Sequence, residues 1–136
     1  MIPAPIRAQL RRTVGTAGVA VALLAGASAF AEAETDAGAR AFQKCYSCHD
    51  VDPATKNLQG PNLADIVGRR AAQVAEFDYS PAMRAAADRG LTWTREALDQ
   101  YLAAPLEFLP GTSMSFVGIK DAAERRAIID YLARQR

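Results

Sequence analysis

The sequence has few cysteines and histidines and almost no net charge. Among 136 residues there are two Cys and one His, and 16 Lys and Arg stand against 15 Asp and Glu. A net charge of +1 argues against a protein that coats nucleic acid or anionic lipid. The two Cys can form only one disulfide, which would close no large loop. A hydrophobic share of 50% indicates one globular domain with a stable core.

The first 31 residues contain no acidic side chain. Three Arg precede an apolar stretch over residues 14–30, which is the order typical of an export signal. Alternating Ala residues predict cleavage after Ala29 or Ala31. The alternative is a retained anchor on the periplasmic face of the inner membrane, although the stretch is short for a membrane span. We therefore expect a signal peptide over residues 1–31, a domain over residues 32–136, and a periplasmic location.

Strand signals are also missing, because no alternating apolar pattern of useful length occurs. The helical signals predict an all-α domain with long loops over residues 50–68 and 106–120. Gly38 has no side chain, so we expect the N- and C-terminal helices to cross there, with Tyr131 or Leu132 as the partner. The capping and periodicity signals predict helices from Asp36 into Cys45, over Ala82–Arg89 after Ser80 and Pro81, from Thr94 to before Pro105, and after the capping-box pair Asp121 and Glu124.

All three scarce residues lie in one motif, Cys45-Tyr46-Ser47-Cys48-His49. This spacing allows two thioether links to one haem, with His49 reaching the iron from the same side. A thioredoxin-like dithiol would need a βαβ pattern, which is missing. A zinc site would need a fourth ligand other than Cys or His. The motif in an exported chain therefore favours covalent haem c, one per chain, over both alternatives.

With no second His, a haem iron bound by His49 must take Met, Lys, water or nothing on its other side. Met83 falls within a predicted helix, where a methionine is typical of apolar core filling. Met114 follows Pro110 and Gly111 in a predicted loop that can carry a thioether across a ring. From these residues alone Met114 is a candidate sixth ligand, and the alternative is a core methionine in a loop.

The chain from Gly38 to Arg136 resembles a class I cytochrome c of the mitochondrial and bacterial type. The resemblance implies the small cytochrome c fold, in which helices and long loops wrap one covalently bound haem. The matching pieces occur in order: Gly38 and Phe42, the Cys45–His49 motif, Gly60-Pro61-Asn62-Leu63, Gly68-Arg69, Phe77-Asp78-Tyr79-Ser80, Trp93, Tyr101-Leu102, Pro110 to Met114, Phe116 to Lys120, and Tyr131-Leu132.

The resemblance also implies roles for individual residues. Cys45 and Cys48 would carry the haem, with His49 and Met114 as the axial ligands. The carbonyl of Pro61 would accept a hydrogen bond from His49. The remaining cofactor-binding positions are Arg69, Tyr79, Ser80 and Trp93 around a propionate, Tyr101 and Thr112 beside the Met ligand, and Phe116 over the haem edge.

The function implied is electron transfer without enzymatic turnover. A periplasmic monomer would shuttle one electron between protein partners of a respiratory or photosynthetic chain, such as a bc-type complex, a terminal oxidase or a dehydrogenase, touching the membrane only transiently. The alternatives are a dedicated electron acceptor of one periplasmic dehydrogenase, or a five-coordinate haem that senses small ligands or acts as a weak peroxidase.

The chain departs from this family in the charge near the haem edge. Without the signal, 13 Lys and Arg stand against 15 Asp and Glu, a net charge of −2. Lys44, Lys56 and Lys120 remain at positions of the family's lysine ring, but other residues replace its lysines at Leu106, Glu107 and Ser113. We therefore expect docking to depend less on electrostatic steering than it does in a family member with the full lysine ring.

Overall fold

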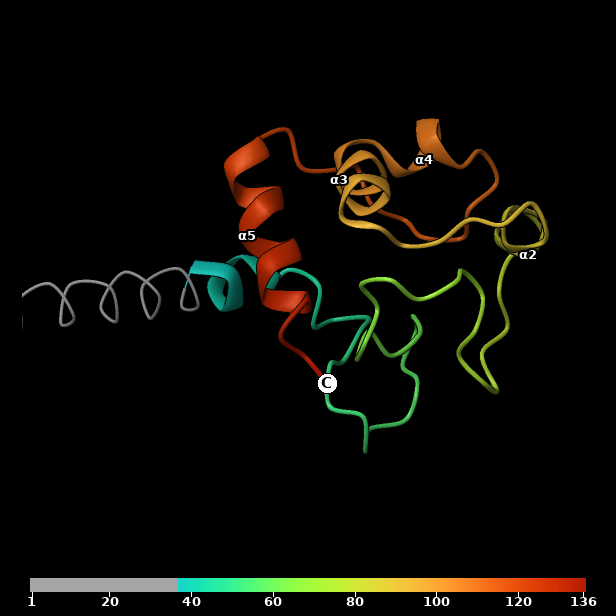
Figure 1. Cartoon of the computed structure of the whole chain (residues 1–136), viewed down its shortest axis with the longest axis horizontal. Helices are drawn as coiled ribbons and strands as arrows, with labels where there is room; N and C mark the ends of the chain where they lie inside the picture. Colours follow the sequence, from blue (N-terminus) through green and yellow to red (C-terminus); the bar gives the residue numbers. More distant parts are fainter. Residues whose placement is uncertain (1–36) are drawn as a thin grey trace, which may run out of the picture.

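The computed structural model describes residues 37–136, which form helices joined by long irregular segments (Figure 1). No strand occurs in this part of the chain, where Arg70 and Thr92 make an isolated antiparallel bridge. The all-α expectation is confirmed. The predicted signal and Asp36 lie outside the described residues. Helical residues 37–42 are followed by α2 (Pro81–Asp88), α3 (Arg95–Ala103), α4 (Pro105–Phe108) and α5 (Ala122–Leu132).

Local capping explains where three of these helices begin. Ser80, Thr94 and Asp121 each accept a hydrogen bond from a backbone N–H two or three residues ahead, at 3.2, 3.1 and 2.8 Å. Each bond satisfies one of the donors that a helix start leaves unpaired. The three N-caps were predicted from the sequence and are confirmed.

Three details differ from the sequence prediction. The first helix ends at residue 42, because the N–H groups of Gln43 and Cys45 bond to carbonyls three residues back and so form tight turns. Part of the segment 106–120 is not irregular, since α4 begins at Pro105, which suits a first helical turn. Glu124 does not complete a capping box in the hydrogen bonds observed, and pairs instead with Lys44.

The first helical residues cross α5 at Gly38, as expected (Figure 1). A Cβ built on Gly38 would lie 2.5 Å from the carbonyl oxygen of Ala127 and 2.7 Å from Cβ of Tyr131. Real Cβ atoms do not approach other atoms this closely. Only glycine therefore permits this crossing, and Tyr131 is confirmed as a contact.

The helices surround a core to which most parts of the chain contribute. α3 packs against α5, and α4 follows α3 directly, whereas α2 lies apart from these helices (Figure 1). Phe42 and Ile128 are fully buried where the first helical residues meet α5. At the C-terminus, the carbonyl of Gln135 accepts a bond of 2.9 Å from the N–H of Asp65. This arrangement leaves a hollow between α2, α3, α5 and the long segment from 43 to 80.

Candidate functional site

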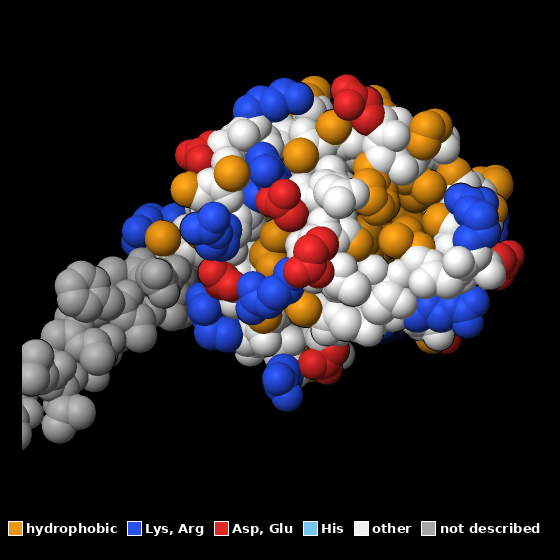
Figure 2. Space-filling model, turned by 45° about the horizontal axis from the view of Figure 1, so that its top comes forward, with side chains coloured by type: hydrophobic (Ala, Val, Ile, Leu, Met, Phe, Trp, Pro, Cys, Tyr) orange, Lys and Arg blue, Asp and Glu red, His pale blue; other side chains and the backbone are white. Residues whose placement is uncertain are grey.

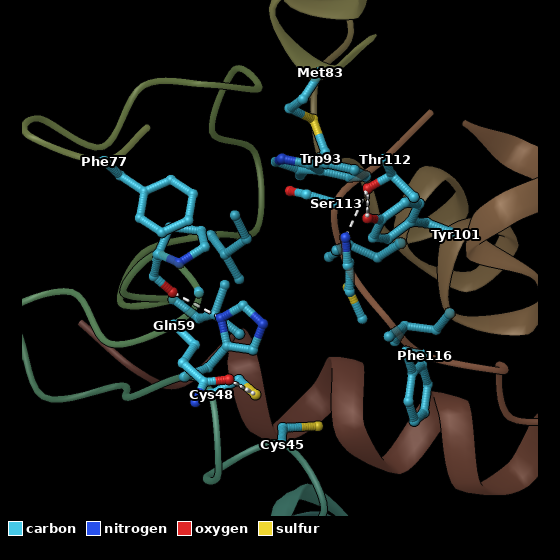
Figure 3. Close-up of a pocket in the computed structure, with 18 of the residues that line it drawn as sticks. Cys45, Cys48, Gln59, Phe77, Met83, Trp93, Tyr101, Thr112, Ser113 and Phe116 are labelled. Carbon is cyan, nitrogen blue, oxygen red and sulfur yellow. Dashed lines mark hydrogen bonds between the residues drawn. The ribbon is translucent and has the colours of Figure 1, made fainter. Parts of the chain in front are cut away.

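A cavity of about 310 Å³ occupies this hollow. Its size is within the range of small-molecule and cofactor sites. Figure 3 shows one wall with Gln59 and Phe77, a facing wall with Trp93, Tyr101 and Phe116, and Cys45 and Cys48 at the lower edge. All twelve predicted site residues line this cavity: Cys45, Cys48, His49, Pro61, Arg69, Tyr79, Ser80, Trp93, Tyr101, Thr112, Met114 and Phe116.

The Cys–His motif is folded into a tight turn. The carbonyl of Cys45 accepts bonds from the N–H groups of Cys48, at 3.0 Å, and His49, at 2.9 Å. Both thiols are free and partly buried at the edge of the cavity (Figure 3). Burial is the main reason that the pKa of Cys45 rises to about 11, so this thiol is uncharged at neutral pH. The turn thus presents two sulfurs and an imidazole to one cavity.

The imidazole of His49 is held in one orientation. Its Nδ1 lies 2.8 Å from the carbonyl oxygen of Pro61, which fits an Nδ1–H donor and leaves Nε2 free as a ligand. Burial lowers the pKa of His49, although the bond to Pro61 opposes this, so the ring is favoured in the neutral form that binds metals.

Gly60 lies directly against this ring. A Cβ at Gly60 would lie 2.6 Å from Nδ1 and 2.8 Å from Nε2 of His49. Sequence reasoning noted Gly60 only as part of a matching motif, because nothing local in the chain shows that its missing side chain makes room for His49.

Met114 comes from the other wall, in the loop between α4 and α5. It follows Ser113, which Figure 3 places across the cavity from Cys48 and Gln59. The hydroxyls of Tyr101 and Thr112 lie 2.9 Å apart, and the Met114 N–H donates to Thr112 Oγ1 at 3.4 Å. These bonds tie the loop to α3. The thioether of Met114 and the imidazole of His49 thus line one cavity from two distant segments of the chain.

Arg69 and Tyr79 form a polar edge of the cavity. The Arg69 guanidinium donates to the carbonyls of Ala64, at 2.7 Å, and Asn62, at 3.0 Å, and the Tyr79 hydroxyl accepts from the N–H of Val74 at 3.2 Å. Burial lowers the pKa of Arg69. Burial also raises the pKa of Tyr79, and the hydrogen bond from Val74 and the positive charge of Arg69 partly oppose that rise. A cation and a hydroxyl here could stabilise a buried carboxylate.

Ser80 and Trp93 have structural roles besides lining the cavity. The Ser80 oxygen caps α2, which leaves its own hydrogen available for donation. Trp93 is 6% exposed, with its ring centroid 5.0 Å from that of Tyr101 and 6.5 Å from that of Phe108. Trp93 is therefore a packed core residue that also forms part of the wall.

The lining residues that were not among the predicted site residues include Gln59, Arg70, Phe77 and Met83. Gln59 Oε1 lies 3.6 Å from the Cys48 sulfur. Arg70 donates twice to the Ala87 carbonyl, at 2.8 and 3.2 Å, and so ties the segment after Arg69 to α2. Gln59 and Arg70 stand next to matching motifs and Phe77 is part of one, so these motifs could have identified them as lining residues. For Met83 the only signal was its position in a predicted helix.

Over residues 37–136 no three His, Cys, Asp or Glu side chains gather as a metal-binding group. The zinc interpretation thus finds no fourth ligand within this range. In the same range no helix is long and apolar enough to span a bilayer.

The donor set fits a covalently bound haem. Two free thiols, one oriented imidazole and one facing thioether surround a mostly apolar cavity, and a polar edge carries Arg69. A glycine accommodates the imidazole ring. These are the groups that haem c attachment and ligation require.

Comparisons with known sequences agree with this donor set. The family model described as Cytochrome c matches residues 35–135. A cytochrome c2 of Rhodomicrobium vannielii is 39% identical over 124 residues, which cover 91% of this chain and 97% of that protein. Cytochrome c type-1 of Ascaris suum is 42% identical over 106 residues, covering 76% of this chain and 90% of that protein.

Solved structures of cytochromes c also align with this chain. Cytochrome c2 from Rhodospirillum centenum aligns with a TM-score of 0.71 at 34% identity, over 74% of this chain and 97% of that one. Cytochrome cH from Methylobacterium extorquens aligns with a TM-score of 0.65 at 38% identity, over 72% of this chain and 95% of that one.

Proposed function

The chain belongs to the cytochrome c family, and from this premise we propose that it is a periplasmic electron carrier that shuttles one electron between protein partners. Proteins of this family bind one haem c covalently, and Cys45, Cys48 and His49 supply the attachment motif. The observation that carries the proposal is that His49 and Met114 line the same, mostly apolar cavity.

When bound, the haem supplies an iron that alternates between the ferrous and ferric states. Cys45 and Cys48 would hold it through thioether bonds, and His49 and Met114 would supply the two protein ligands of the iron. The Pro61 carbonyl orients His49 and strengthens it as a ligand. Two protein ligands leave no open position for a substrate, so we expect electron transfer without turnover.

Other lining residues set the surroundings of the iron. Tyr101 and Thr112 hold the Met114 loop through their shared hydrogen bond. Phe116 lines the cavity two residues beyond Met114 and covers the haem edge. The soft thioether and the apolar walls both favour the ferrous state, which raises the reduction potential.

Arg69, Tyr79, Ser80 and Trp93 hold the haem propionates. All four line the cavity. Arg69 and Tyr79 interact electrostatically in the folded chain, so they lie at one edge. A buried carboxylate needs such donors because burial without partners is costly. These four side chains would therefore stabilise the propionates of a bound haem.

The partners are redox proteins that dock near Phe116. The exposed apolar side chains of the domain include Val117, which follows Phe116 and is 89% exposed, and Leu106 on α4, which is 58% exposed. Figure 2 shows hydrophobic side chains gathered in and around a hollow, with basic side chains at its outer edge. A bc-type complex, a terminal oxidase and a dehydrogenase are the candidate classes. The predicted export signal over residues 1–31 supports a periplasmic location.

Spectra of the purified holoprotein test the proposal. We expect sharp α and β bands in the reduced state, and in the ferric state the weak far-red band of an iron–thioether bond. Met114→Ala should remove that band and lower the reduction potential. A high-spin wild-type spectrum, or a Met114→Ala spectrum identical to wild type, would contradict the proposal. The mass of the protein should show the added haem and a chain beginning after Ala29 or Ala31.

A further inference from the structure

Besides Met114, one other methionine lines the cavity. Met83 is 8% exposed and belongs to the inner face of α2 together with Ala86 and Ala87. Its thioether is directed into the cavity beside Trp93 in Figure 3. The electron-carrier proposal gives Met83 no task, although its side chain forms the α2 part of the wall.

α2 packs directly against the loop that carries Met114. A Cβ built on Gly111 would lie 3.2 Å from Cβ of Ala82, the residue before Met83. Figure 3 places Met83 on the same side of the cavity as Thr112 and Ser113. Met83 therefore lies where the wall of α2 meets this loop.

The hydrogen bond at Met114 itself is long. The Met114 N–H reaches Thr112 Oγ1 only at 3.4 Å, whereas the loop is joined to α3 by the Tyr101–Thr112 pair at 2.9 Å and by the Ile119 N–H, which donates to the Leu102 carbonyl at 2.8 Å. A water molecule entering beside Thr112 would compete for these hydroxyls. The closed position of Met114 thus depends on keeping water out.

The Met83 side chain adds no strong hydrogen-bonding group for such a water, and the nearest available donor on α2 is the Ser80 hydroxyl at its start. Tyr101 and Thr112 bind one another, and within residues 37–136 no buried side-chain nitrogen or oxygen lacks a hydrogen-bond partner. A buried water usually needs two to four polar partners. A flexible, apolar thioether fills the space without offering any.

We propose that Met83 seals the α2 side of the cavity, and so keeps Met114 on the iron against water and added ligands. This inference rests on the proposed electron-carrier function and deepens it. Met83 acts through the Met114 loop and is therefore a positioning residue. In this protein the packing of α2 would determine whether Met114 stays bound to the iron or is replaced by a small ligand.

Imidazole titration of the ferric holoprotein tests the proposal, because imidazole competes with Met114 for the iron. Met83→Gln keeps a similar length but adds an amide that is unpaired when the wall is closed. We expect imidazole to bind about tenfold more tightly to this variant than to wild type, since an unpaired buried amide disfavours the closed state. Met83→Leu keeps an apolar wall and should bind within about twofold of wild type.

Ile129→Val is the control for general loss of stability, because Ile129 is buried on α5 but does not line the cavity. It should lower the unfolding midpoint without tightening imidazole binding. Equal affinities for Met83→Gln and Met83→Leu would overturn the role of Met83, as would an Ile129→Val effect as large as that of Met83→Gln. Both of these results would leave the electron-carrier function intact. A wild-type protein without the iron–thioether band would instead overturn that function and this inference together.

Discussion

The phenol oxygens of Tyr46 and Tyr131 lie 2.7 Å apart and join the turn between the two cysteines to α5. The ring of Phe42 packs against both, with centroid distances of 4.7 Å to Tyr46 and 5.2 Å to Tyr131. Phe42 and Tyr131 were among the residues that matched the family, whereas Tyr46 was only a spacer in the Cys–His motif. The contact ties the attachment turn to α5.

This pair predicts a change in stability at alkaline pH. Burial, with the hydrogen bond to Tyr46, raises the pKa of Tyr131 from its usual value near 10 to about 12. The neutral phenol is thus favoured in the folded state, and this contribution to stability is complete below pH 10 and lost as the pH rises through 12. The free energy of unfolding of Tyr131→Phe should therefore fall less steeply between pH 10 and pH 12 than that of the wild type.

Denaturant unfolding of wild type and Tyr131→Phe at several pH values measures this effect. At neutral pH the variant should be less stable by about 1 kcal/mol, the usual value of a lost hydrogen bond. The difference should shrink toward pH 12. A difference that stays constant across the alkaline range would show that Tyr131 does not titrate with unfolding.

Gly60→Ala should disturb haem ligation. Its Cβ would lie 2.6 Å from Nδ1 of His49, and the backbone there cannot move freely because Pro61 follows and holds the same ring. We expect loss of the low-spin spectrum or of stable haem incorporation. Gly68→Ala is the matched control, because no atom lies within 4 Å of its Cβ and only its positive φ of 86° is strained. Equal spectra for the two variants would argue against the steric role of Gly60.

Gly38→Ala should weaken the crossing of the two terminal helices. The added Cβ meets the Ala127 carbonyl and the Cβ of Tyr131, both rigid parts of α5, so we expect a loss of about 1–3 kcal/mol or more in the free energy of unfolding. The visible spectrum of the folded variant should not change. Gly90→Ala, with a φ of 92° and no atom within 4 Å, should cost only about 1 kcal/mol. A Gly38→Ala protein as stable as wild type would disprove a close crossing.

Electron transfer to a physiological partner should depend only weakly on salt. Leu106 and Val117 are exposed apolar side chains, and of the three lysines at ring positions Lys44 is paired with Glu124. Less positive charge is therefore available for long-range attraction than in a family member with the full lysine ring. Oxidation rates measured with membranes that contain a terminal oxidase should change little between low and physiological ionic strength.

The matched variant for this experiment is Leu106→Lys, which places a cation on the exposed side of α4. It should raise the rate on an acidic partner at low salt and make the rate fall more steeply as salt is added. A steep salt dependence in the wild type would contradict apolar docking.

The sequence by itself determined the features that depend on neighbours along the chain. The attachment motif places two thiols and an imidazole within five residues, and Ser80, Thr94 and Asp121 cap helices through N–H groups two or three residues away. Such short-range geometry is the same wherever the segment lies, so spacing alone predicts it.

Only the tertiary structure decided which distant groups meet. Gly60 lies against His49, Glu124 pairs with Lys44 rather than capping its own helix, and α4 forms within a segment expected to be irregular. Met83 looked like an ordinary core methionine until α2 was found packed against the Met114 loop. These contacts join segments far apart in the chain. They depend on how whole elements pack, and local sequence patterns carry no record of that packing.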